Sequence, residues 1–174
     1  SIDWSRADAA NTLEAVQLYL EQHPDGEHFD EATDKMKMLN ANTVTPEDKI
    51  LVGTVFDGLF QSLNNRDENG LMNSFSPLIA KFLGKANATR SDVVTFMHKI
   101  YKSDVASMNW MSLEDYAITK KEVGDQQYEY TVVFSGLQKV EHTDNSSSET
   151  RFRFNAKVNP DGRITELNMT KILE

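Results

Sequence analysis

The amino-acid sequence predicts an α+β protein in which helices are followed by a curved antiparallel sheet. The main observation is that residues 126–173 read as consecutive strands joined by turn signals. A second observation is a capped amphipathic helix over residues 90–103, directly before these strands. A third is a helical pattern over residues 3–39, which predicts a separate helical hairpin at the start of the chain. A sheet curved around helices often encloses a pocket, so the sequence indicates a shape before it indicates an activity.

The composition is that of a globular chain with an acidic balance. The 174 residues are 39% hydrophobic and 26% charged, enough apolar content for one sizeable core. The net charge of −9 argues against nucleic acid as a partner, because phosphate contacts need clustered Lys and Arg, and against direct membrane binding. The absence of Cys excludes disulfides, thiolate nucleophiles and Cys-based zinc sites.

The chain begins at Ser1, without an initiator Met and without an apolar signal segment. We therefore expect a trimmed or mature form. This favours a location outside the cytoplasmic membrane, in the periplasm, with the chain tethered by a removed N-terminal segment. No apolar run reaches the roughly 18 residues that a membrane-spanning helix needs.

Residues 1–44 are predicted to be a helical hairpin and a separate domain. The first helix is expected over residues 3–22 and the second over about 27–39, because the turn at residues 23–26 contains Pro and Gly. This segment carries three basic and nine acidic side chains, a net charge of −6. The apolar positions of the first helix fall at helical spacing: Trp4, Ala9, Leu13, Val16 and Leu20.

The same segment contains a longer pattern, W-x2-A-x3-N-T-x-E-A-x3-Y-L-x2-H-P-x-G-x-H, which runs from Trp4 to His28. This pattern resembles a tetratricopeptide-style helical-hairpin repeat found beside other domains in bacterial multidomain proteins. It covers about 28 residues and occurs once. Its positions are mostly packing and capping positions, so the resemblance implies an architecture and a larger bacterial protein rather than an activity.

A strong helix is predicted to begin at Thr45, with Thr as N-cap and Pro46 at the first helical position. Residues 71–83 are apolar and irregular, with Pro77 in the middle, and are expected to form a short helix or a loop. The buried stripe of the strong helix is predicted to be Val52, Val55, Phe56, Leu59, Phe60 and Leu63.

The second half alternates between apolar and polar residues. Strands are expected over residues 108–111, 116–121 and 128–140, with a bulge at Gly136. A turn at residues 159–162 predicts a hairpin between strands 151–158 and 163–173.

From residue 45 onward, this order of elements resembles the nuclear transport factor 2-like superfamily. The resemblance also rests on the helix R-S-D-V-V-x-F-M at residues 90–97. It implies a cone-shaped fold with a pocket between the helices and the curved sheet, over residues 45–174. Members include isomerases, dehydratases, small-ligand binders and interaction or assembly modules. The resemblance also implies a homodimer formed through the sheet.

The inward-facing side chains are expected either to fill the core or to line a pocket for a small apolar ligand, with Tyr hydroxyls orienting it. Both alternatives remain open at this stage. The candidate pocket residues are Phe56, Phe60, Met97, Tyr101, Trp110, Tyr130, Phe134 and Phe154.

No catalytic residue, metal site or cofactor is assigned. The four histidines lack the spacing of a metal site, and no Gly-rich phosphate loop is present. The leading hypothesis is a non-catalytic small-ligand-binding or protein-interaction module of a larger bacterial protein. The alternative is a small-molecule isomerase or dehydratase that uses a pocket carboxylate as its base. The base would then be one of Asp57, Asp92, Asp104 and Asp115.

Overall fold

The computed structural model describes residues 2–173, which form two compact units. One unit contains residues 2–45 together with Lys120–Tyr128, and the other contains Pro46–Thr119 together with residues 129–173. Within residues 2–173, no helix combines the length and the apolar character needed to cross a membrane.

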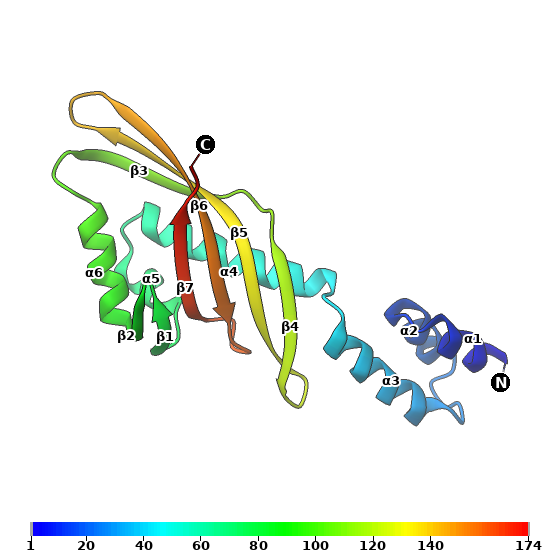
Figure 1. The fold of residues 1–174 in the computed structure, drawn as a ribbon. Coiled ribbons are helices and arrows are strands. Elements are labelled where there is room, and N and C mark those ends of the chain that lie inside the picture. Colours follow the sequence, from blue (N-terminus) through cyan, green and yellow to red (C-terminus); the bar gives the residue numbers. More distant parts are fainter. Residues whose placement is uncertain (1, 174) are drawn as a thin grey trace. The chain divides into compact units, whose positions relative to one another are not determined.

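Helices precede most of the strands, as Figure 1 shows, and the predicted α+β class is confirmed. The helices are α1 (Ile2–Ala10), α2 (Leu13–Gln22), α3 (Phe29–Asn42), α4 (Pro46–Asn64), α5 (Glu68–Asn73) and α6 (Arg90–Ile100). The strands are β1 (Leu78–Phe82), β2 (Lys85–Thr89), β3 (Val105–Ser112), β4 (Ala117–Gly124), β5 (Gln127–His142), β6 (Ser147–Val158) and β7 (Ile164–Lys171).

The N-terminal segment forms three helices rather than the predicted two. A single helix over residues 3–22 is wrong, because Asn11 adopts a left-handed conformation with φ of 56° and ends α1. Thr12 then starts α2, its side chain accepting a hydrogen bond of 3.2 Å from the backbone N–H of Ala15. An Asn–Thr pair supplies both signals, since Asn tolerates this conformation and Thr is a good N-cap.

The first unit is held together by stacked rings at positions of the W-to-H pattern. The indole of Trp4 stacks on His28 at 5.8 Å between ring centroids, and Tyr19 stacks on His23 at 4.8 Å. Gly26 lets the chain pass close to this stack, since a Cβ there would lie 3.0 Å from the Tyr19 hydroxyl. The pattern thus specifies packing positions.

The sheet of the second unit has the strand order β2-β1-β7-β6-β5-β3, with β4 also paired to β5. Strand β5 is long enough, at 16 residues, to pair with β6 and with both β3 and β4. Strands β1 and β7 run parallel, so the sheet is mixed and not purely antiparallel as predicted. The predicted hairpin of β6 and β7 is confirmed.

The segment expected to be irregular, residues 71–83, instead ends in strand β1, which pairs with β2 as a hairpin. The turn is made by Leu83 and Gly84, with φ of 48° and 87°. Positive φ at both central residues matches the twist of two-residue hairpins. The apolar run reads as irregular because Pro77 interrupts it, although the strand begins directly after this proline.

The expected bulge at Gly136 is also wrong. The backbone ladder continues through Gly136, which pairs with Ser112 on one side and Phe152 on the other. The glycine serves close packing, because a Cβ there would lie 2.6 Å from the ring of Phe154. The register shifts of the sheet lie elsewhere, near Val105 in β3 and near Val158 in β6.

Candidate functional site

Aromatic rings fill the space between α4 and the inner face of the sheet. Phe134 and Phe154 are paired across β5 and β6, and their rings stack at 5.0 Å with planes 12° apart. From α4, the ring of Phe56 lies 4.5 Å from that of Phe134, and Phe60 stacks on Trp110 at 6.1 Å. All five side chains are buried.

A small cavity of about 20 Å³ lies beside this stack, inside the second unit. A cavity of roughly 10–15 Å³ holds about one water molecule, so this space is far too small for a ligand such as a steroid or polyketide. Every residue that lines it is apolar: Leu59, Phe60, Leu63, Leu71, Phe75, Phe82, Leu83, Val93, Phe96, Trp110, Phe154, Leu167 and Met169.

The eight candidate pocket residues therefore lie in three environments. Three of them line the small cavity: Phe60, Trp110 and Phe154. Three others are buried among neighbouring side chains without lining it: Phe56, Met97 and Phe134. The two tyrosines, Tyr101 and Tyr130, direct their hydroxyls at protein acceptors.

Tyr101 ends α6 and ties it to the end of α4. Its hydroxyl donates a hydrogen bond of 2.7 Å to the carbonyl oxygen of Leu63. Burial raises the pKa of Tyr101 above its ordinary value, although the guanidinium of Arg66 lies 4.5 Å over the ring and opposes the shift. The hydroxyl is thus a structural donor at neutral pH.

Three of the candidate bases have structural partners. Asp92 completes the cap of α6 with Thr89, and a hydrogen bond from Lys85, followed by that from Thr89, lowers its pKa. Asp104 lies 3.6 Å from His142 at the surface. Asp115 accepts a hydrogen bond of 2.6 Å from the backbone N–H of Ser135. None of these carboxylates lines the internal cavity, nor does the exposed Asp57.

The Asp115→Asn variant is expected to lose a pH-dependent part of the stability. Burial raises the pKa of Asp115, but the hydrogen bonds from Ser135 outweigh burial and hold the pKa below its ordinary value. A lowered folded-state pKa stabilises the fold above the ordinary carboxyl pKa, and this stabilisation disappears as the pH falls through the folded-state value. Urea unfolding at pH 7 and between pH 4 and 2 measures the effect. The difference in the free energy of unfolding between Asp115→Asn and the wild-type chain should become smaller as the pH falls.

The exposed control Asp161→Asn should show no such trend. A difference between Asp115→Asn and the wild-type chain that does not change with pH would contradict the assignment.

A buried carboxylate that the sequence reasoning missed is Asp48, in the first turn of α4. The hydroxyl of Tyr130 donates a hydrogen bond to its Oδ1 atom. The sequence could have indicated its burial, because Asp48 lies four residues before Val52 and eight before Phe56, on the predicted buried stripe of the helix. Neither Asp48 nor Tyr130 lines the internal cavity.

No group of three or more His, Asp or Glu side chains within residues 2–173 is arranged to hold a metal ion. His98 is exposed, and its ring lies 2.7 Å from the carboxylate of Glu68.

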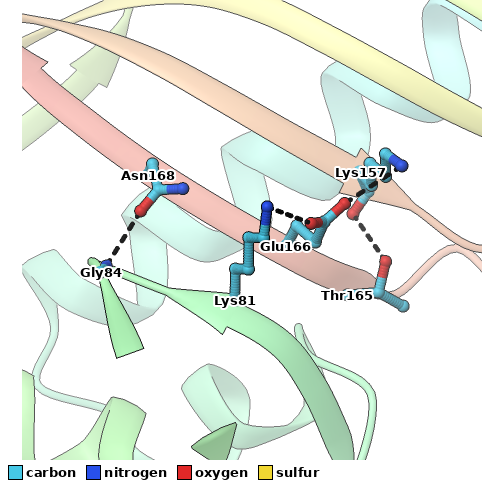
Figure 2. Close-up of polar contacts among 6 residues, drawn as sticks. All are labelled: Lys81, Gly84, Lys157, Thr165, Glu166 and Asn168. Atoms are coloured by element: carbon cyan, nitrogen blue, oxygen red, sulfur yellow. Dashed lines mark hydrogen bonds and ion pairs between the residues drawn. The ribbon is translucent and has the colours of Figure 1, made fainter. Parts of the chain in front are cut away.

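The opposite, outer face of the sheet carries a row of charges. Glu166 of β7 pairs in register with Lys81 of β1 and with Lys157 of β6. Its neighbour Leu167 lines the internal cavity, so Glu166 points away from the interior. Figure 2 shows the carboxylate between the two ammonium groups, 3.9 Å from that of Lys81 and 3.3 Å from that of Lys157.

This row borders an open groove of about 570 Å³. The ladder between β1 and β7 joins Lys81 to Glu166 and Phe82 to Leu167, and a further parallel bridge joins Phe75 to Ile164. Between these contacts, residues 77–80 bulge away from β7. The groove is lined by Leu78, Ile79, Ala80, Asn87, Ala88, Glu129, Lys157, Thr165 and Glu166.

Comparisons with solved structures agree with this architecture. A nuclear transport factor 2 (NTF2-like) superfamily protein from Salmonella enterica serovar Typhimurium matches with a TM-score of 0.58 and 12% identity, over 72% of this chain and 92% of its own. ActVI-ORFA from Streptomyces coelicolor matches with a TM-score of 0.56 and 15% identity, over 70% and 95%. The hexachlorocyclohexane dehydrochlorinase LinA-type3 from Novosphingobium barchaimii matches with a TM-score of 0.55 and 9% identity, over 73% and 88%.

The sequence matches no protein-family model and no curated protein. At these identities the likeness establishes the fold, and the predicted resemblance to the nuclear transport factor 2-like superfamily is confirmed at that level. Solved structures with this fold include a named enzyme as well as proteins without a stated activity.

Proposed function

We propose that the chain is a non-catalytic protein-interaction module, which binds an extended basic segment of a partner protein in the groove on the outer face of its sheet. The main support for this proposal is a comparison of two volumes in the second unit, that of the internal cavity and that of the outer groove. Stacked aromatic rings leave about 20 Å³ inside the cone, whereas the outer groove offers about 570 Å³. A recognition surface on the outside fits this distribution better than a chemical site on the inside.

The charges in the groove favour a basic partner. Glu166 is already neutralised by two lysines, Lys81 and Lys157. The half-buried carboxylate of Glu129 has no hydrogen-bond or ion-pair partner among residues 2–173. An incoming Lys or Arg would provide one, and long-range attraction to a chain of net charge −9 would speed its approach.

The groove also offers an apolar contact. Leu78 is 79% exposed, and the small Ala80 lies on the same face of β1, two residues later. An apolar side chain of the partner would bury this leucine. The expected occupant is therefore an extended segment with a basic residue close to an apolar one.

Selection of displayed random peptides against the whole chain tests the proposal. The enriched peptides should contain Lys or Arg beside an apolar residue. Their affinity, measured by fluorescence polarisation, should fall at least tenfold for Glu129→Lys and for Leu78→Asp. The control Glu149→Lys, another exposed glutamate of the sheet, should bind as the wild-type chain does. The proposal fails if no peptide is enriched, or if the groove variants bind the enriched peptides unchanged.

One observation favours the alternative of a small-molecule isomerase or dehydratase. The Asp48–Tyr130 pair joins a buried carboxylate to a phenol, two groups that such enzymes combine. Native mass spectrometry of the purified chain separates the two proposals. We expect the mass of the chain alone, and a retained small molecule would favour the alternative. The same spectra report the oligomeric state. If the wild-type chain is a dimer and Glu129→Lys is a monomer, the partner in the groove would be a second copy of the chain rather than another protein.

A further inference from the structure

A serine, a histidine and an aspartate meet at one end of the second unit. They are Ser148 near the start of β6, His142 at the end of β5 and Asp104 in the loop between α6 and β3. Figure 1 shows this loop and the hairpin of β5 and β6 at the same end of the sheet. The backbone N–H of Thr143 donates a hydrogen bond of 2.9 Å to the carbonyl oxygen of Asp104, which fastens the loop to the hairpin. None of the three residues lines the outer groove.

The register of the hairpin places His142 and Ser148 on one face. The backbone N–H of His142 donates a hydrogen bond of 2.8 Å to the carbonyl oxygen of Ser146, and Ser148 lies opposite Val140. Side chains two residues apart on a strand share a face, so His142 and Ser148 are diagonal neighbours. The hydroxyl oxygen of Ser148 is 3.5 Å from Nε2 of the imidazole.

The aspartate determines which ring nitrogen of His142 carries the proton. Oδ2 of Asp104 lies 3.6 Å from Nδ1 of His142. A carboxylate accepts hydrogen bonds and cannot donate them, so the contact favours the tautomer with its proton on Nδ1. Nε2 is then an acceptor, and it faces the Ser148 hydroxyl. A carboxylate at Nδ1 and a hydroxyl at Nε2 form the arrangement that activates a serine, whatever the order of the residues in the chain.

A second carboxylate adds negative charge near the imidazole. Hydrogen bonds from the hydroxyl and the N–H of Ser146 lower the pKa of Asp144, and the charge of His142 lowers it further. The imidazolium that forms when His142 takes up a proton is therefore near two negative charges. The side chain of His142 is 25% exposed, so solvent weakens this stabilisation without removing it. Ser148 is exposed, so a reagent can reach it.

The open edge of β6 supplies a backbone donor beside the serine. Strand β7 ends opposite Phe152, and the N–H of Ile172 donates to the carbonyl oxygen of Arg151. The backbone groups of alternate residues in a strand point to the same edge, so the N–H of Glu149 points to this side. Among residues 2–173, no strand is paired with β6 there. Because Glu149 directly follows Ser148, its N–H can donate to the oxygen of a group that reacts with the hydroxyl.

We propose that Ser148 is a nucleophile that accepts an acyl group from an activated ester, with His142 as its base and Asp104 as the positioning residue for the imidazole. The bond from the serine oxygen to the acyl carbon forms, and the bond from that carbon to the leaving oxygen breaks. The serine proton passes to Nε2 of His142 and then to the leaving oxygen, which departs as an alcohol. Each chain consumes one donor, so this is a site of covalent modification, separate from the proposed binding of a peptide.

The test is incubation of the whole chain with p-nitrophenyl acetate, followed by digestion and mass spectrometry that measures acetylation at each residue. We expect Ser148 to be acetylated faster than its neighbours Ser146 and Ser147. His142→Asn should slow acetylation of Ser148 at least tenfold, because the general base is removed. Asp104→Asn should slow it several-fold, and Asp104→Glu should restore the rate because it keeps a carboxylate.

The control is Ser147→Ala, whose side chain lies on the opposite face of β6 and whose loss should leave acetylation of Ser148 unchanged. Three results would overturn the proposal: equal acetylation of the three adjacent serines, acetylation of lysines alone, or an unchanged rate at Ser148 in His142→Asn. The substituted side chains are at least partly exposed, so each variant should keep the Tm of the wild-type chain. Peptide binding in the outer groove should persist in every variant, so failure here leaves the proposed function untouched.

Discussion

Replacing Phe134 with alanine is expected to lower the free energy of unfolding by about 3–5 kcal/mol. The side chain is 1% exposed and lies at the centre of the ring stack. Its ring centroid is 4.5 Å from that of Phe56, 5.0 Å from Phe154 and 6.1 Å from Phe60. The substitution removes this burial and leaves a cavity that three neighbouring rings cannot close. Urea denaturation followed by tryptophan fluorescence measures the loss.

The matched control is Phe29→Ala, where the side chain is 43% exposed, and the expected loss is below about 1 kcal/mol. An apolar cavity of this kind takes up benzene, so benzene should raise the Tm of Phe134→Ala and leave that of the wild-type chain unchanged. A loss of less than about 1 kcal/mol for Phe134→Ala would mean that the cone is loosely filled. The proposal of an interaction module would then lose its main support.

Tyr130→Phe is expected to cost about 1–3 kcal/mol of stability at pH 7, the usual cost of removing one partner of a buried hydrogen bond. Tyr130 is 5% exposed and Asp48 is 8% exposed, so water cannot readily replace the lost donor. Because phenylalanine keeps the ring, the change isolates the hydroxyl. Urea unfolding at pH 7 measures the loss.

The double-mutant cycle with Asp48→Asn decides whether the two groups act on each other. We expect a coupling energy of about 1 kcal/mol or more, because the hydrogen bond joins them directly. A coupling near zero would mean that Tyr130 contributes through packing alone. A Tyr130→Phe variant of unchanged stability would suit a group kept for chemistry and would strengthen the enzyme alternative.

Local signals explain the parts of the fold that were predicted correctly. Thr45 and Pro46 start α4, Thr89 and Asp92 cap α6, and the turn after Val158 joins β6 to β7. Each signal acts over a few residues, so the sequence alone reveals it. The helix break at Asn11 belongs to the same class and could have been predicted, because Asn–Thr is a local stop and start.

The errors concern contacts between distant residues. Gly136 is required by the ring of Phe154, which no pattern within β5 indicates. Strand β1 pairs in parallel with β7, more than eighty residues later, and this pairing makes the sheet mixed. Local periodicity cannot identify the partner of a strand, since pairing depends on the topology of the whole sheet.

In the candidate site, too, some features follow from local sequence signals and others from contacts between distant residues. The sequence by itself determined which residues are apolar and inward-facing, and the eight candidates are all near the core because the periods of helix and strand place them there. Only the tertiary structure decided that these rings stack and leave about 20 Å³, because cavity size depends on how side chains from α4, β3, β5 and β6 interlock. The tertiary structure also gathered Glu129, Lys157 and Glu166 around one groove. Such surfaces arise from segments far apart in the chain, and no local pattern encodes them.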